Sequence, residues 1–155
     1  GLIYIGGGMS IFILLRNLEV ANFFNTGAIW LALIATWSTD TGAYFIGKFF
    51  GKRKLVKKIS PNKTIEGALG GILFTLATVI LFAINLELYS FSWIFYGIFA
   101  SIVAIIGDLF ESSLKRDMDV KDSGSVIPGH GGILDRFDSL LFTIPFTYYF
   151  LTLLL

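Results

Sequence analysis

The sequence contains no cysteine, one histidine, three prolines and few charged residues for its length. The absence of cysteine excludes disulfides and thiolate metal sites. Charged residues make up 15% of the 155 residues, whereas soluble domains average about 25%. Hydrophobic residues make up 55%, and the mean hydropathy is +0.77. This composition predicts an integral membrane protein. The net charge of +1 gives no reason to expect a nucleic acid partner.

Apolar runs divide the chain into candidate transmembrane helices. A helix that crosses a bilayer core of about 30 Å needs about 20 apolar residues. The runs predict an all-α membrane protein with about five such helices, at residues 1–15, 27–50, 65–84, 92–113 and 133–155. The chain opens on glycine inside an apolar run, and the first span is short. We therefore expect residues 1–155 to be a single transmembrane domain that forms the C-terminal part of a longer chain.

Basic residues between the spans predict the orientation. The segment 51–64 holds six Lys and Arg residues and the segment 114–132 holds three, whereas 16–26 and 85–91 hold one between them. Two spans separate the basic segments, so both fall on the same face. The positive-inside rule assigns that face to the cytoplasm.

Asp40 lies inside the second predicted span. A carboxylate at the centre of a lone membrane helix costs roughly 2.5–3.5 kcal/mol, so it must face a partner, the bundle interior or water. A structural pair between helices and a polar cavity are both open. The cavity is favoured by the neighbouring hydroxyl residues Thr36, Ser38, Thr39 and Thr41.

The end of the first basic segment combines a helix break with a helix start. Ser60 and Pro61 stop any preceding helix, and Asn62 or Thr64 can cap the next one. Capping by itself explains Thr64 and Glu66. Lys63 has no such structural role, and beside a helix N-terminus it would complete an anion site. The other bases of this segment are explained by topology and by anionic headgroups.

Acidic residues recur at two predicted helix ends on the cytoplasmic side. Asp108 and Glu111 are three residues apart on one helix, as are Asp135 and Asp138 on another, so each pair shares a helix face. Converging carboxylates repel one another unless a cation binds them, and such hard oxygen ligands suit Mg²⁺. The alternative is that each acid pairs with Lys115, Arg116 or Arg136.

Polar groups are concentrated in residues 112–138, between two segments without charged residues. This stretch holds five acids, four bases, the histidine and four glycines. The glycines around His130 leave backbone amides open to a ligand, and His130 itself has a structural or a functional role. Cation ligands, fixed positive charges and open amides suit phosphoryl or nucleotidyl transfer. The position at a lipid interface suggests a lipid and a nucleotide as reactants. The alternatives are a cation transporter and an inert assembly subunit.

Three motifs resemble the phosphatidate cytidylyltransferase (CDP-diacylglycerol synthase) family. The longest is Ser112-x-Leu114-Lys115-Arg116-x4-Lys121-Asp122-x-Gly124-x2-Ile127-Pro128-x-His130-Gly131-Gly132-Ile133-x-Asp135-Arg136-Phe137-Asp138. The others are Asp40-Thr41-Gly42-Ala43-Tyr44 and Ser60-Pro61-x-Lys63-Thr64-x-Glu66-Gly67, and Gly107-Asp108 extends the first motif upstream. The resemblance covers roughly residues 36–140. It implies that these residues are the catalytic part of a longer enzyme.

The resemblance also implies a reaction and a set of roles. Family members make CDP-diacylglycerol and pyrophosphate from CTP and phosphatidic acid with Mg²⁺, and K⁺ is a candidate second cation. Separately, the compact chain without extensions favours a bacterial inner membrane location, and a homodimer is a candidate assembly. A CTP-dependent polyprenol kinase is the alternative within the same chemistry. Metal ligands would be Asp108 and Asp135, with Glu111 and Asp138 as secondary candidates. Catalytic residues would be Lys115, Arg116, Lys121, Asp122, His130 and Arg136. Substrate-binding residues would be Ser60, Lys63, Thr64, Glu66, Asp40, Gly131 and Gly132.

Overall fold

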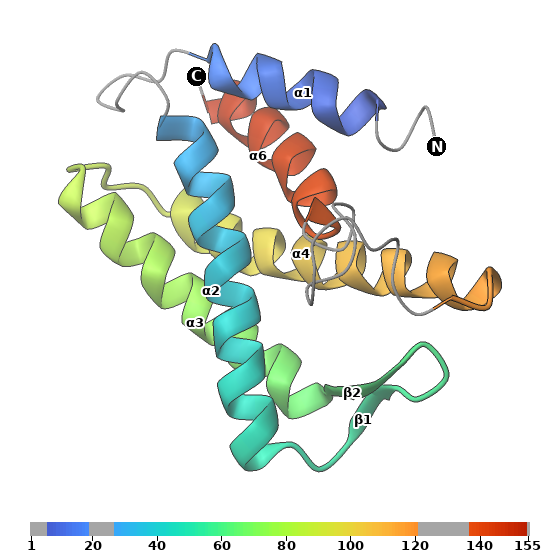
Figure 1. Cartoon of the computed structure of the whole chain (residues 1–155). Helices are drawn as coiled ribbons and strands as arrows, with labels where there is room; N and C mark the ends of the chain where they lie inside the picture. The colour runs from blue at the N-terminus through green and yellow to red at the C-terminus, as the bar shows by residue number, and fades with distance from the viewer. Residues whose placement is uncertain (1–5, 19–26, 121–136, 155) are drawn as a thin grey trace, which may run out of the picture.

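A computed structural model of the chain describes residues 6–18, 27–120 and 137–154 (Figure 1). The described part is mostly helical, as the sequence predicts. The helices are α1 (Gly7–Arg16), α2 (Gly27–Phe50), α3 (Ile65–Asn85), α4 (Ser92–Asp117) and α6 (Leu140–Leu154). A small sheet interrupts them, formed by β1 (Lys54–Val56) and β2 (Ser60–Thr64).

The β1–β2 hairpin corrects the prediction of an all-α fold with a loop at 51–64. The two strands are antiparallel, with Lys54 opposite Thr64 and Val56 opposite Ser60. The hairpin escaped sequence analysis because strands of three and five residues are too short to show a clear alternation of apolar and polar residues. Pro61 is compatible with β2 because a two-stranded sheet has only edge strands.

Two of the described helices, α3 and α4, are long and apolar enough to cross a membrane. Helices α1 and α6 are apolar but shorter. Of the roughly five predicted spans, two are therefore supported by the length and composition of the described helices. Helix α4 continues to Asp117, which places Lys115 and Arg116 in a last helical turn rather than in the predicted loop. Positive side chains are favourable there because the helix dipole is negative at that end.

Helices α2 and α3 lie side by side and are joined at one end by the hairpin (Figure 1). Glycines on both helices allow their backbones to approach closely. A Cβ atom at Gly42 would lie 2.8 Å from the carbonyl oxygen of Gly70, and one at Gly71 would lie 2.8 Å from that of Thr39. The two helices also share a hydrogen bond of 2.7 Å between the hydroxyls of Thr39 and Thr75. Small residues and interhelical hydroxyls are typical of helix packing in membranes.

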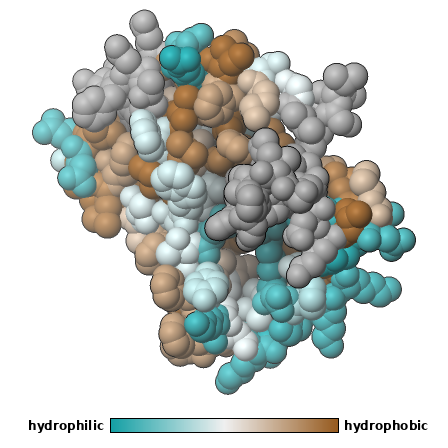
Figure 2. Space-filling view, viewed as in Figure 1, coloured by the Kyte–Doolittle hydropathy of each residue, from teal (hydrophilic) through white to brown (hydrophobic). Residues whose placement is uncertain are grey.

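Helix α4 packs against both α3 and α6, and so links these two helices within the bundle. Tyr96 of α4 is fully buried, and its hydroxyl shares a hydrogen bond of 2.9 Å with Thr147 of α6. Near the other end of α4, a Cβ atom at Gly107 would lie 3.0 Å from the carbonyl oxygen of Asp138. The close approach at Gly107 therefore brings the segment before α6 next to Asp108. Figure 2 shows the largest hydrophilic area over the hairpin and the end of α4.

Candidate active site

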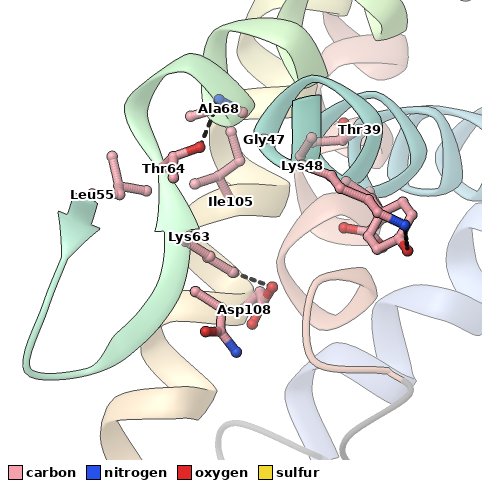
Figure 3. Close-up of a pocket in the computed structure, with 14 residues that line it drawn as sticks. Thr39, Gly47, Lys48, Leu55, Lys63, Thr64, Ala68, Ile105 and Asp108 are labelled. Atoms are coloured by element: carbon pink, nitrogen blue, oxygen red, sulfur yellow. Dashed lines mark hydrogen bonds and ion pairs between the residues drawn. The ribbon is translucent and has the colours of Figure 1, made fainter. Parts of the chain in front are cut away.

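A pocket of about 460 Å³ lies among α2, α3, α4 and the hairpin (Figure 3). The hairpin belongs to the basic segment 51–64, so the pocket lies on the side of that segment. Its polar lining is contributed by three elements that are far apart in the sequence. Helix α2 contributes Thr39, Asp40, Tyr44 and Lys48, β2 contributes Asn62, Lys63 and Thr64, and α4 contributes Asp108. Apolar side chains such as Leu55 and Ile105 complete the walls. The pocket thus combines charged groups of both signs with an apolar surface.

Lys63 and Asp108 form an ion pair across this pocket (Figure 3). The ammonium of Lys63 donates to Oδ2 of Asp108, and the side chains are 28% and 27% exposed. The hydroxyl of Ser112 lies 3.4 Å from Oδ1 of the same carboxylate. The sequence suggested an anion site at Lys63 and a cation site at Asp108, and the structure places the two side chains in direct contact.

Two further acids lie within electrostatic range of this pair. Asp40 and Asp138 both interact with the charges of Asp108 and Lys63. They come from α2 and from the residues just before α6, so the charges of three segments influence one another. Among the described residues, these three acids outnumber the two pocket lysines, Lys63 and Lys48, and an excess of negative charge favours binding of a cation.

Thr64 forms the junction between the hairpin and α3. It is the N-cap of α3, and its hydroxyl accepts a hydrogen bond of 3.1 Å from the backbone N–H of Gly67, which confirms the predicted cap. A Cβ atom at Gly67 would lie 3.0 Å from this hydroxyl and 2.9 Å from the carbonyl oxygen of Ala43. The absence of a side chain at Gly67 therefore lets the capped end of α3 touch α2 and close one end of the pocket.

Glu66 fixes the start of the hairpin. Its carboxylate accepts hydrogen bonds from the backbone N–H groups of Lys52, at 3.0 Å, and Arg53, at 3.1 Å. The backbone N–H of Ile65 in turn donates to the carbonyl oxygen of Arg53 at 2.9 Å. Glu66 does not line the pocket. Its contacts hold β1 against the start of α3, and therefore hold β2 and Lys63 in place.

The end of α4 carries a second set of charged residues. Lys115 forms an ion pair of 2.5 Å with Oε2 of Glu111, which is 1% exposed. The pairing is the alternative that the sequence left open for the acids, and the structure shows it for Glu111. Nε of Arg116 lies 3.4 Å from the carbonyl oxygen of Ile59 in the hairpin turn, so α4 also contacts the outer end of the hairpin.

Comparison with known proteins gives a match over nearly the whole chain. The model of the cytidylyltransferase family matches residues 2–154. The chain belongs to this family. It is 50% identical over 153 residues to a phosphatidate cytidylyltransferase of Bacillus subtilis, which covers 97% of this chain and 56% of that protein. It is 48% identical over 127 residues to a phosphatidate cytidylyltransferase of Synechocystis, which covers 81% of this chain and 43% of that protein. The chain thus spans about half the length of these curated relatives.

Several residues assigned by resemblance to this cytidylyltransferase family lie outside the described residues. They are Lys121, Asp122, His130, Gly131, Gly132, Asp135 and Arg136. The other predicted site residues are all described. Of these, the pocket brings together Asp40, Lys63, Thr64 and Asp108, whereas Ser60, Glu66, Glu111, Lys115, Arg116 and Asp138 are not among its lining residues.

The part of this site that the structure describes is chemically compatible with a divalent cation. Within residues 6–18, 27–120 and 137–154, no three acidic or histidine side chains are grouped so that they could hold one metal ion. Mg²⁺, however, is commonly bound by one or two carboxylates together with substrate phosphates. Asp108 supplies a carboxylate that is partly buried and faces the pocket. Its hard oxygen atoms fit the requirement for such an ion.

Tyr44, Lys48 and Asn62 line the pocket, although none of them was predicted as a site residue from the sequence. Tyr44 and Lys48 follow Asp40 at steps of four residues, so the three side chains share one face of α2. The Nζ atom of Lys48 lies 3.4 Å from the hydroxyl of Tyr44. A search for polar residues at helical spacing around Asp40 would have identified this face. Asn62 has no such signal because it depends on the hairpin.

The role of Glu66 leads to a testable prediction. Glu66→Gln removes the carboxylate charge and leaves one carbonyl oxygen for two N–H donors, so we expect faster amide hydrogen exchange at Lys52 and Arg53. Charge-assisted hydrogen bonds to backbone amides are stronger than neutral ones. The matched control is Glu87→Gln, which makes the same change at the other end of α3. Equal exchange at both amides in the wild type and in Glu66→Gln would contradict the positioning role.

Proposed function

We propose that this chain carries the catalytic centre of an enzyme that transfers the cytidylyl group of CTP to phosphatidic acid. The products are CDP-diacylglycerol and pyrophosphate, for phospholipid synthesis. The observation that carries the proposal is the 50% identity to a phosphatidate cytidylyltransferase over 97% of the chain. Further support comes from the pocket, which combines carboxylates, lysine side chains and an apolar wall in a protein with membrane-compatible helices.

The proposed reaction is an in-line substitution at phosphorus. A phosphate oxygen of phosphatidic acid attacks the α-phosphorus of CTP, and the bond to the bridging oxygen of pyrophosphate breaks. The attacking phosphate is already ionised at neutral pH, so no strong general base is required. The task of the protein is to position two anions and to offset their charge.

Residues of this chain have distinct roles in the proposed reaction. Lys63 and Lys48 offer ammonium groups to phosphate oxygens inside the pocket. Asp108 would hold Mg²⁺, which when bound supplies charge neutralisation at phosphate oxygens and orients them. Asp135 is proposed as a second ligand, with Glu111 and Asp138 as secondary candidates and K⁺ as a second cation. Outside the pocket, Lys115, Arg116, Lys121 and Arg136 are proposed to offset charge on the leaving pyrophosphate, and Asp122, His130, Gly131 and Gly132 to orient the nucleotide.

The location is part of the proposal. The basic hairpin and the basic end of α4 lie on the same side of the structure (Figure 2). This arrangement supports a cytoplasmic site in a bacterial inner membrane, because basic segments are retained on that face. A nucleotide could then reach the site from water, and a phosphate could reach it from the inner leaflet. The proposal includes a homodimer, which light scattering of the protein in detergent would test.

Labelled CTP tests the reaction directly. The full-length protein in detergent is incubated with phosphatidic acid, Mg²⁺ and CTP that carries ³²P at the α or at the γ position. We expect the α label in the lipid fraction and the γ label in pyrophosphate. Transfer of the γ label to a polyprenol would instead identify a CTP-dependent lipid kinase. Cation flux into liposomes without nucleotide, together with no labelled product, would identify a transporter.

A further inference from the structure

The ion pair between Lys63 and Asp108 joins the side chain that suits a phosphate to the side chain that suits a cation. The ammonium of Lys63 donates to Oδ2 of the Asp108 carboxylate, and the hydroxyl of Ser112 lies next to Oδ1. Both members line the pocket and are about one-quarter exposed. In this arrangement the charge of Asp108 is offset from within the protein, and the ammonium of Lys63 is not available to a ligand.

The backbone of Lys63 is fixed, but its side chain can move. The pairs of Ser60 with Val56 and of Thr64 with Lys54 flank Lys63 across an irregularity in the register. The cap at Thr64 and the contact of Glu66 with the hairpin hold this main chain against α3. The lysine side chain is a flexible stem of four carbon atoms that ends in a compact charged ammonium group. The ammonium can therefore leave Asp108 and reach a ligand in the same pocket without any change in β2.

A cation at Asp108 competes with this ammonium. Like charges at one carboxylate oxygen repel each other, and the repulsion is stronger in a partly buried site than in water. Lys63 also interacts with the charges of Asp40 and Asp138, so its departure exposes the excess negative charge of the whole region. An anion that attracts Lys63 thereby creates the conditions for a cation to bind.

We propose that Lys63 is the internal counter-ion of Asp108 and that a phosphate-bearing substrate takes this lysine away, which opens the carboxylate to a divalent cation. The identity of the anion as a phosphate rests on the proposed function, whereas the competition between lysine and cation does not. Cation and phosphate binding then strengthen each other by the same factor, since such coupling is reciprocal. The free enzyme binds the cation weakly and acquires it together with its substrate.

The test measures cation affinity in the absence of any substrate. Mn²⁺ is titrated into the full-length protein in detergent, and free Mn²⁺ is followed by electron paramagnetic resonance. We expect Lys63→Met to bind Mn²⁺ about tenfold more tightly than the wild type, within the usual range of coupling between sites. Lys63→Gln, a second neutral variant, is expected to behave in the same way. Thermal unfolding confirms that each variant is folded.

Lys48→Met is the matched control. It removes the same charge from the same pocket, but Lys48 contacts the hydroxyl of Tyr44 rather than Asp108. We expect its Mn²⁺ affinity to stay within about twofold of the wild type, well below the coupling range. An unchanged affinity in both Lys63 variants would overturn the proposal. An equal gain in Lys48→Met and Lys63→Met would also overturn it, because it would indicate a general effect of charge.

A second titration separates this inference from the proposed function. Short-chain phosphatidic acid is titrated into wild-type protein with and without Mg²⁺, and into Lys63→Met. We expect Mg²⁺ to strengthen binding about tenfold in the wild type and clearly less in the variant. If phosphatidic acid binds in neither case while Lys63→Met still gains Mn²⁺ affinity, the counter-ion role stands and the proposed substrate is wrong. Equal strengthening in both proteins overturns the exchange of Lys63.

Discussion

Asp108→Asn is expected to reduce cytidylyl transfer by at least about 100-fold, which corresponds to about 3 kcal/mol of lost transition-state stabilisation. The amide that replaces the carboxylate carries no charge and is a poor ligand for a hard cation. It also leaves Lys63 without its partner of opposite charge. The rate of CDP-diacylglycerol formation at saturating CTP and Mg²⁺ measures the effect.

Asp117→Asn provides the matched control for this substitution. Asp117 is an exposed residue at the end of the same helix, and it does not line the pocket. We expect its turnover to stay within about twofold of the wild type, as surface substitutions usually have small effects. Thermal unfolding of both variants separates a loss of chemistry from a loss of folding. Near-normal activity of folded Asp108→Asn would remove Asp108 from the proposed site.

Gly42→Ala is expected to destabilise the protein by about 1–3 kcal/mol, the usual cost of overpacking a well-packed interior. The added Cβ would lie 2.5 Å from Cβ of Phe74 and 2.8 Å from the carbonyl oxygen of Gly70. A backbone oxygen cannot rotate away as a flexible side chain can, so α2 and α3 must separate. We expect the midpoint of thermal unfolding in detergent to fall by about 5 °C.

Gly7→Ala makes the same chemical change in an open position. A Cβ at Gly7 meets no atom within 4 Å. Alanine in a helix is favoured over glycine by roughly 0.5–1 kcal/mol, so the midpoint should stay the same or rise. A similar decrease in both variants would show that the effect of Gly42→Ala does not come from the contact between α2 and α3. Lys48 and Asp40 lie on α2, as Gly42 does. Gly42→Ala should therefore also disturb the arrangement of these residues in the pocket.

The helices were predictable because their signals are local. The apolar run predicted at 65–84 corresponds closely to α3, and Thr64 caps that helix as its residue type and position suggest. The end of α4 was predicted too early because Lys115 and Arg116 were taken as loop residues, although they are well suited to a last helical turn. The hairpin was missed because its stability depends on Glu66 and on the start of α3 rather than on its own sequence.

By itself, the sequence determined the membrane-compatible composition, the capped start of α3, and the residue types needed for phosphate and cation chemistry. These properties follow from hydropathy, backbone preferences and motif spacing, all of which act over short distances along the chain. The contact between Lys63 and Asp108 was decided only by the tertiary structure. The two residues are 45 positions apart. They meet because α4 packs against α3 and because Glu66 holds the hairpin against the start of α3. Charge complementarity predicts that such residues attract, but only packing determines which of several lysines reaches which carboxylate.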